Sequence, residues 1–415
     1  MFITKLGMKN LFRHKKRTVI TAVLISLAIL IYLITDSLMT GMVELSYNNI
    51  INLESGHIQI SRPGYWEERD ELPLDNLMIL SDSLKKGIQT LGKYRGMAEQ
   101  IKFSARLNNG IDELPVTALG IKNSEQEEVF TTSDYLIEGT FFKSGEYKAV
   151  LGQTLAELME LSTGDYITLL IRTEGGTFNT IDLEISGLLK TPNPTINGSI
   201  VYLPIEIAQE SLNIGDKISQ IVVRLDVDKH KTDIFVEELN ERLNKSKLNL
   251  QAYSWEESAG EVIAMSEAQS TETVTILGII LLIASVGIIN TTILSALERM
   301  EEIGMMKALG LKENEIIWAF MIEAAGIGII GGLIGWLLSI GGVYYLAEIG
   351  ISFSNLAGED MSFGMPIMDT IYGAWNMSAF IFIFVFGVIV AVLSSIFPAW
   401  WAAKKDPIKA IYHKK

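Results

Sequence analysis

The stretch ERMEEIGMMKALG, residues 298–310, decides the fold because it lies between two long runs that carry no charge. The run before it, residues 273–297, has 25 residues, and the run after it, 324–347, has 24. Each exceeds the ~18 apolar residues that mark a transmembrane helix. The stretch is therefore a short charged elbow held between two membrane spans.

The elbow carries charges of both signs at helical spacing, and Gly310 is placed where a helix would stop. This spacing predicts a short helix over 298–307. A solvated loop is the alternative, and spacing alone leaves both open.

Composition limits the class of protein. The 415 residues are 48% hydrophobic, which allows several spans plus a large domain outside the membrane. The net charge of −15 argues against a nucleic-acid partner, and the absence of cysteine excludes disulfides and thiolate metal sites. The four histidines are scattered along the chain, so no metal centre is expected.

Basic residues predict the topology. Six Lys or Arg lie in 1–17, three in the elbow region and five in the tail after residue 400, whereas 348–376 has none. By the positive-inside rule both ends and the elbow are cytoplasmic, and the large insert is extracytoplasmic. The predicted parts are a cytoplasmic amphipathic helix (1–17), span one (18–43), an extracytoplasmic domain (44–272), span two (273–297), a cytoplasmic elbow (298–315), span three (316–347), a short outer loop (348–376), span four (377–400) and a tail (401–415).

An uncleaved first span is preferred over a cleaved signal peptide, because the basic region is long and no A-x-A site follows.

The inserted domain is acidic and mixed in structure. Residues 44–272 hold 20 Lys/Arg and 37 Asp/Glu, a net charge of −17. Alternation predicts strands at 56–61, 116–121, 166–171, 182–188, 200–203 and 220–225, and helical spacing predicts helices at 83–94, 152–161, 205–212 and 233–243. Residues 174–176 read as a hairpin turn, and helical stretches at 42–52 and 255–270 extend the spans as a stalk. The fold class is an integral membrane α-helical protein with four spans and a large α+β domain inserted between the first two.

Several residues in or near the spans, most of them polar, are candidates for function. Glu323, one to two turns into span three, either pairs near the elbow or reaches the inner interface. Asp36, Met42 and Asn290 are candidates for a substrate path, although interfacial exposure is the simpler reading of Asp36. Asn290, Thr291 and Thr292 are expected to make hydrogen bonds between helices.

No catalytic motif is found. The sequence has no G-x-x-x-x-G-K-[ST], so this chain is expected neither to hydrolyse ATP nor to bind a cofactor of its own. The G-x-G-x-x-G at 326–331 lies inside a span rather than after a strand, so its glycines indicate close helix packing through the pairs Gly328/Gly332 and Gly331/Gly335.

Three motifs resemble the superfamily of FtsX-like, lipoprotein-releasing and macrolide-exporter permeases. The elbow is similar to its E-R-x-x-E-I-G-x-x-[RK]-A-x-G segment. Residues 6–18 are similar to its basic opening helix, and Pro398-Ala399 through Ala410-Ile411 resemble its closing motif. In the insert, residues 55–60 and 150–165 look like its extracytoplasmic core domain.

This resemblance implies an ABC permease that works with a separate ATPase dimer, which binds the ATP and Mg²⁺, and with a second permease subunit, identical or different. Membrane lipid, a lipoprotein cargo and a periplasmic carrier are the further partners it implies, and a bacterial inner membrane is the location it implies. The elbow at 298–315 would be the coupling helix that docks on the ATPase. By position, the elements facing the ATPase would be Arg299, Glu302, Gly304, Lys307, Ala308 and Gly310, with Glu323 in support.

The substrate is left open by the same comparison. Release of lipoproteins from the inner membrane is the leading expectation. An FtsX-like transmitter that regulates an outer enzyme, and an antibiotic or peptide exporter, are the alternatives. The short turn at 173–180 lacks the proline-bearing hook of the carrier-grasping permease, so the chain would be its partner permease or a related exporter.

Overall fold

A computed structural model describes residue 13 and residues 15–246, 248–352 and 370–405. The predicted amphipathic helix at 1–17, the loop 348–376 and the tail therefore lie largely outside the described residues. The chain divides into a helical unit and a sheet unit, which are considered separately below.

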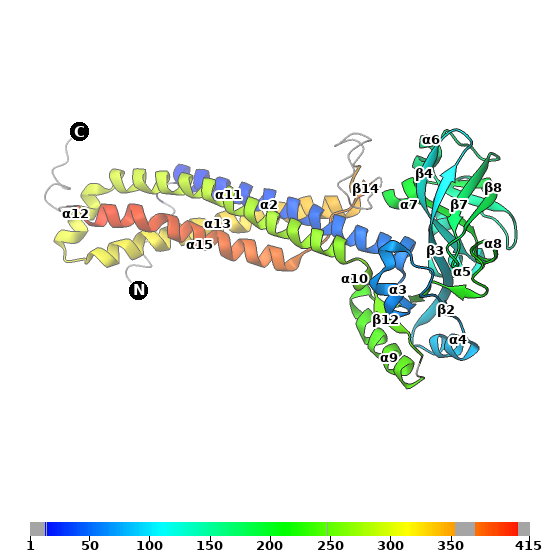
Figure 1. The fold of residues 1–415 in the computed structure, drawn as a ribbon. Helices are drawn as coiled ribbons and strands as arrows, with labels where there is room; N and C mark the ends of the chain where they lie inside the picture. Colours follow the sequence, from blue (N-terminus) through cyan, green and yellow to red (C-terminus); the bar gives the residue numbers. More distant parts are fainter. Residues whose placement is uncertain (1–12, 14, 247, 353–369, 406–415) are drawn as a thin grey trace. The chain divides into compact units, whose positions relative to one another are not determined.

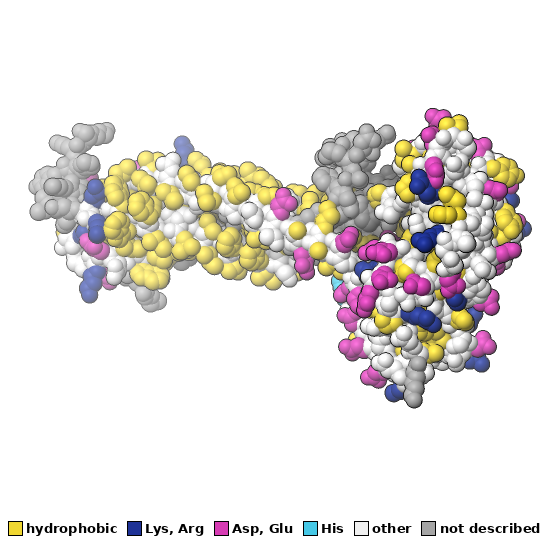
Figure 2. Space-filling model, viewed as in Figure 1, with side chains coloured by type: hydrophobic (Ala, Val, Ile, Leu, Met, Phe, Trp, Pro, Cys, Tyr) yellow, Lys and Arg dark blue, Asp and Glu magenta, His cyan; other side chains and the backbone are white. Residues whose placement is uncertain are grey.

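Four helices in the described residues are long and apolar enough to cross a membrane. They are α2 (Lys15–Ile50), α11 (Gly260–Glu298), α13 (Glu313–Glu348) and α15 (Met377–Ala403), and each predicted span lies within one of them (Figure 1). Hydrophobic side chains cover their visible surface between the ends (Figure 2). At 1.5 Å per residue, even the 27 residues of α15 are about long enough for a bilayer core of about 30 Å.

The glycines of α13 bring its backbone against two neighbours. A Cβ on Gly331 would lie 2.7 Å from the Ala22 carbonyl oxygen of α2, and one on Gly335 would lie 2.8 Å from that of Ser26. Gly328 and Gly332 face α15, where a Cβ would lie 3.2 Å from the Val388 backbone and 2.9 Å from the Phe384 ring, respectively. The predicted packing role of both glycine pairs is confirmed.

The sheet unit is built on ten strands. Their order is β12-β1-β11-β3-β4-β9-β6-β8-β5, with β7 pairing β3 and β8. The strands are β1 (Ile58–Ser61), β3 (Tyr94–Asn108), β4 (Glu113–Ile121), β5 (Leu136–Gly139), β6 (Lys148–Gly152), β7 (Tyr166–Arg172), β8 (Phe178–Leu189), β9 (Ile200–Pro204), β11 (Gln220–Leu225) and β12 (Gln251–Ser254). Two short strands, β2 (Met78–Ile79) and β10 (Lys217–Ile218), pair separately.

Helices pack on this sheet through their apolar sides. α4 (Asp82–Gln89), α6 (Gln153–Leu158), α8 (Ile205–Leu212) and α9 (Thr232–Lys245) supply the main core with side chains such as Ile88, Leu155, Ala208 and Leu239. A second cluster contains Leu119, Val150 and Tyr202 together with Ile196 of α7 (Pro194–Ser199) and with Leu53. The remaining short helices are α3 (Pro63–Glu67), α5 (Asn123–Val129) and α10 (Trp255–Ser258).

The six predicted strands and four predicted helices are present, but two helix boundaries were wrong. The helix expected at 83–94 ends at Gln89, because Lys93 takes a left-handed φ of 63° and the chain enters β3 at Tyr94. The helix expected at 152–161 ends at Leu158, close to Glu160 with φ of 52°. The β7–β8 hairpin turns at Gly176, as predicted.

The segments predicted to extend the spans are helical. α2 continues to Ile50 and is followed by a π-helical turn at Ile51–Ser55. α10 leads into α11, and Trp255 of α10 packs on Tyr47 of α2 with ring centroids 5.1 Å apart.

Candidate functional site

The elbow is a short helix, α12 (Met300–Ala308), set between α11 and α13. Arg299 joins α11 to α12, and its backbone N–H still bonds to the Ser295 carbonyl at 3.2 Å. The helix ends at Gly310, whose φ of 96° is open to glycine and unfavourable for other residues. Gly310 N–H donates to the Lys307 carbonyl and Leu311 N–H to the Met306 carbonyl, which together form a Schellman cap. The predicted helix and its stop are confirmed.

Arg299 points into the helical unit rather than out to solvent. Its Nη1 lies 3.1 Å from Oε2 of Glu323 on α13, and the two side chains are only 6% and 5% exposed. Of the two readings that the sequence left open for Glu323, pairing near the elbow is therefore the one found. A buried ion pair needs both partners, because either charge alone would be costly in this apolar setting.

Lys307 ties the elbow to the end of α15. Its ammonium donates to the carbonyl oxygens of Ala403 at 2.7 Å and Lys405 at 3.0 Å, and lies 3.4 Å from Glu313 Oε1. A cation on the last carbonyls of a helix satisfies acceptors that have no partner within the helix and interacts favourably with the helix dipole. Lys307 thereby fixes α12 against both α13 and α15.

Glu302 forms an ion pair with Arg13, near the N-terminus of the chain. Its Oε1 lies 2.8 Å from Arg13 Nη1, and both side chains are partly exposed. The elbow is thus held from four directions, by Arg13, α11, α13 and α15.

The opposite side of α12 is exposed and largely apolar. Glu301, Met305, Ala308 and Leu309 are exposed and follow the i, i+4, i+7, i+8 spacing of one helix face. Met305 is 53% exposed and Leu309 83%, whereas Ile303 and Gly304 on the inner side are buried. This exposed face, Glu301, Met305, Ala308 and Leu309, is called the elbow face below.

The six residues selected from the sequence thus divide into groups. Arg299 and Gly304 lie inside, Glu302 and Lys307 bind other parts of the chain, and Ala308 and Gly310 are exposed. Met305 and Leu309 were not selected, although their spacing around the elbow helix could have identified them.

The candidates for a substrate path do not converge. Asp36 accepts a hydrogen bond from Asn376 at 3.1 Å, Met42 is buried, and Asn290 is exposed on α11. One expected bond between helices is found, from Thr21 to Thr291 at 3.3 Å, while Thr292 bonds within its own helix. No group of three His, Asp or Glu able to hold a metal occurs in the part of the chain that the structure describes.

Comparison with known proteins places these features in a family. The MacB-like periplasmic core domain matches residues 18–240, and the FtsX-like permease C-terminal domain matches residues 274–407. An uncharacterised ABC transporter permease of Methanocaldococcus jannaschii is 28% identical over 69% of this chain and 68% of its own length.

Two further relatives carry functional names. The lipoprotein-releasing system transmembrane protein LolC of Xylella fastidiosa is 24% identical over 77% of this chain and 78% of LolC. The macrolide export ATP-binding/permease protein MacB of Psychrobacter arcticus is 26% identical over 98% of this chain, which spans 59% of the length of MacB.

The core-domain match alone extends over more than half of the 415 residues, and the elbow lies within the second match. The four apolar helices, with the sheet unit inserted between the first and second, agree with both matches. The chain therefore belongs to the family of ABC transporter permeases with a MacB-like periplasmic core domain and an FtsX-like C-terminal domain.

Proposed function

We propose that this chain receives mechanical work from a separate ABC ATPase through the elbow face and uses it to extract or export a lipidated or amphipathic substrate. Two ATPase chains and a second permease subunit would complete the transporter. ATP and Mg²⁺ would bind the ATPase, and the chain itself would carry out no chemistry.

The observation that carries this proposal is the contrast between the two sides of α12. The inner side is fixed by a buried ion pair to α13 and by Lys307 on α15, while the outer side presents two large apolar residues. A helix held in this way transmits a push instead of bending. Burying an exposed leucine or methionine contributes about 1.5–3 kcal/mol, so Met305 and Leu309 can anchor a partner.

The same contacts define the path by which a force on α12 would reach the membrane helices. A force on the elbow face passes from Arg299 to Glu323 on α13 and from Lys307 to the end of α15. Movement of the ATPases would therefore reach three spans at once, since α11 is joined to α12 through Arg299.

Release of lipoproteins is the substrate assignment we favour. LolC, by its name, is part of a lipoprotein-releasing system, and it matches this chain over more than three quarters of both lengths. Export of an antibiotic or peptide is the second candidate, favoured by the match to MacB over nearly the whole of this chain. An FtsX-like transmitter without transport is the third, favoured by the FtsX-like match at residues 274–407.

The elbow face is tested by Leu309→Glu. The variant places a charge in the proposed apolar contact without touching any internal anchor, so capture of a co-expressed ABC ATPase should fall strongly. Ile111→Glu makes the same change at an equally exposed site in the sheet unit and should leave capture unchanged. Equal capture by both variants would remove the elbow face as the ATPase contact.

The three functions are separated by one assay of the intact complex in membrane vesicles. Loss of a lipidated protein from the vesicles on ATP hydrolysis supports lipoprotein release. Movement of a macrolide or peptide instead supports export. Hydrolysis without movement of either supports a signal transmitter.

A further inference from the structure

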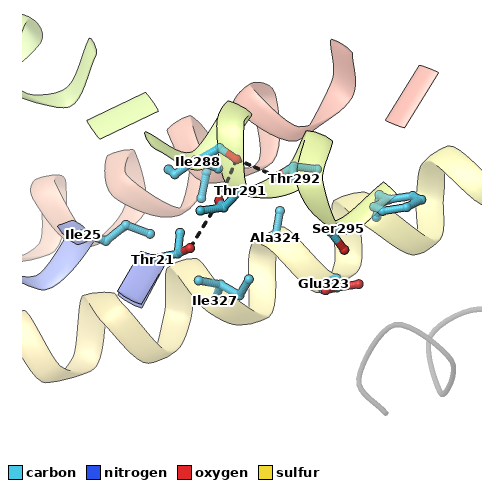
Figure 3. Close-up of a pocket in the computed structure, with 11 residues that line it drawn as sticks. Thr21, Ile25, Ile288, Thr291, Thr292, Ser295, Glu323, Ala324 and Ile327 are labelled. Atoms are coloured by element: carbon cyan, nitrogen blue, oxygen red, sulfur yellow. Dashed lines mark hydrogen bonds between the residues drawn. The ribbon is translucent and has the colours of Figure 1, made fainter. Parts of the chain in front are cut away.

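A small pocket lies beside the elbow, among helices α2, α11, α13 and α15 (Figure 3). Its volume is about 20 Å³, which is room for one water molecule. The apolar part of its lining is Ile25, Ile288, Phe320, Ala324, Ile327 and Ala391. The polar part is Thr21, Thr291, Thr292, Ser295 and Glu323. Five polar side chains around a space of this size are unusual inside a bundle of membrane spans.

Ser295 differs from most hydroxyl residues of these helices. The hydroxyls of Ser285, Thr292, Ser339 and Ser395 each donate to a carbonyl three or four residues earlier. The Ser295 hydroxyl has no partner among the described residues, although the residue is only 1% exposed. Figure 3 shows it pointing toward the side chain of Glu323. A buried hydroxyl without a partner is costly, so this geometry points to a ligand.

The electrostatics of the pocket select an uncharged ligand. Glu323 lines it, but its charge is balanced by Arg299 at 3.1 Å. Neither a cation nor an anion gains a net attraction there. Hydroxyl and carboxylate oxygens can instead bind the hydrogens of a water molecule, and the Ser295 hydroxyl can donate to its oxygen.

We propose that the pocket binds one water molecule, which bridges the Ser295 hydroxyl and the Glu323 carboxylate and keeps that carboxylate oriented toward Arg299 while the elbow is under load. Ser295 lies one turn before Arg299 on the same helix face, and its carbonyl accepts the Arg299 N–H. The water therefore lies next to the ion pair and gives Glu323 a second hydrogen-bond donor, which holds its carboxylate in place beside Arg299. Binding of the water stands by itself, while its mechanical role rests on the coupling function proposed above.

The binding site is tested by high-resolution structures of the full chain in lipid nanodiscs, with water as the probe. Wild type and Ser285→Ala should both show ordered density between Ser295 Oγ and the Glu323 carboxylate. Ala324→Val fills the pocket without touching a hydroxyl, and Ser295→Ala removes one bridging group, so both should lose the density. A dry wild-type pocket, with Ser295 rotated to bond the Thr291 carbonyl, would overturn the site.

The mechanical role is tested by ATP turnover of the permease–ATPase complex. Ser295→Ala and Ala324→Val should each bind the ATPase normally yet lose turnover several-fold, while Ser285→Ala keeps it. Wild-type turnover in both pocket variants would overturn the role of the water. If the ATPase fails to bind even the wild-type chain, the proposed function fails, and the density experiment still decides the water site.

Discussion

Arg299 and Glu323 show what a single buried pair contributes. Replacing Glu323 by Gln leaves the Arg299 charge buried without its counter-ion, so we expect a loss of about 3–5 kcal/mol in the free energy of unfolding. Unfolding of the purified chain in detergent measures the loss. The double change Arg299→Met and Glu323→Leu removes both charges and should recover much of it.

The matched control is Glu238→Gln, which breaks an ion pair with Arg242 on the surface of α9. Both of those side chains are more than a third exposed, so the expected loss is below about 1 kcal/mol. Equal losses at Glu238 and Glu323 would contradict the structural role given to the buried pair.

A substitution at Gly310 tests the C-terminal cap of α12 without changing side-chain packing. A Cβ there would meet nothing within 4 Å, so Gly310→Ala acts only through the backbone, whose φ of 96° should make it cost about 1–2 kcal/mol. Gly278→Ala, also with open space but inside α11, should be neutral or stabilising by up to about 1 kcal/mol. Thermal unfolding compares the two; a neutral Gly310→Ala would refute the strained cap.

His57 gives the sheet unit a dependence on pH. Burial, and then the positive charge of Arg224, lower the pKa of His57 to about 4. Between its usual pKa of about 6.5 and this value the unfolded chain binds the extra proton, so stability falls as the pH decreases, by roughly 3 kcal/mol over the whole interval. His57→Gln should remove this part of the slope in denaturant unfolding followed from about pH 7 to about pH 4.5. An unchanged slope would show that His57 does not contribute.

At the scale of elements, the glycines of α13 predict a strong difference between neighbouring positions. Gly335→Val places its side chain against the Ser26 backbone of α2 and should cost about 1–3 kcal/mol through forced separation of the helices. Gly341→Val makes the same change on the same helix with nothing within 4 Å, and should be neutral or slightly stabilising, because valine has a higher helix propensity than glycine. Similar losses in thermal unfolding would contradict the packing role of Gly335.

Element prediction from the sequence succeeded where one face of an element is buried. α8 was predicted at its observed bounds because its apolar residues keep helical spacing. β3, the longest strand, was missed. Its first half is buried on both faces, since Ala98 packs with Val129 and Val222 while Met97 lies in the main core, so no alternation remains to be read.

The site was only partly predictable for a related reason. The charges of the elbow and its terminal glycine are local and visible in the sequence. Lys307 binds the backbone carbonyl groups of Ala403 and Lys405, far along the chain. Every residue has such a carbonyl, so the sequence does not show which ones Lys307 would bind. The pocket depends on Thr21, Ser295 and Glu323 from three helices, whose relative rotation no single-helix pattern contains.

At the scale of the whole molecule, the absence of cysteine permits a direct test of topology. Ile111 in the sheet unit and Leu309 on the elbow face are both more than 80% exposed, so a cysteine can be placed at either position as a labelling site. In intact cells, a maleimide that cannot cross membranes should label the first and reach the second only after permeabilisation. Labelling of Leu309→Cys in intact cells would contradict a cytoplasmic elbow.

The glycine contacts of α13 also have a mechanical consequence. Where helix backbones are in direct contact, no flexible side chains lie between them. We therefore expect α2, α13 and α15 to move together as one closely packed group. α11 is the least buried of the four helices: 12% of its most apolar 18-residue segment is buried, against 33–50% of the corresponding segments of the other three. The bundle therefore consists of three closely packed helices and one loosely packed helix, and we expect relative sliding to concentrate between α11 and the other three.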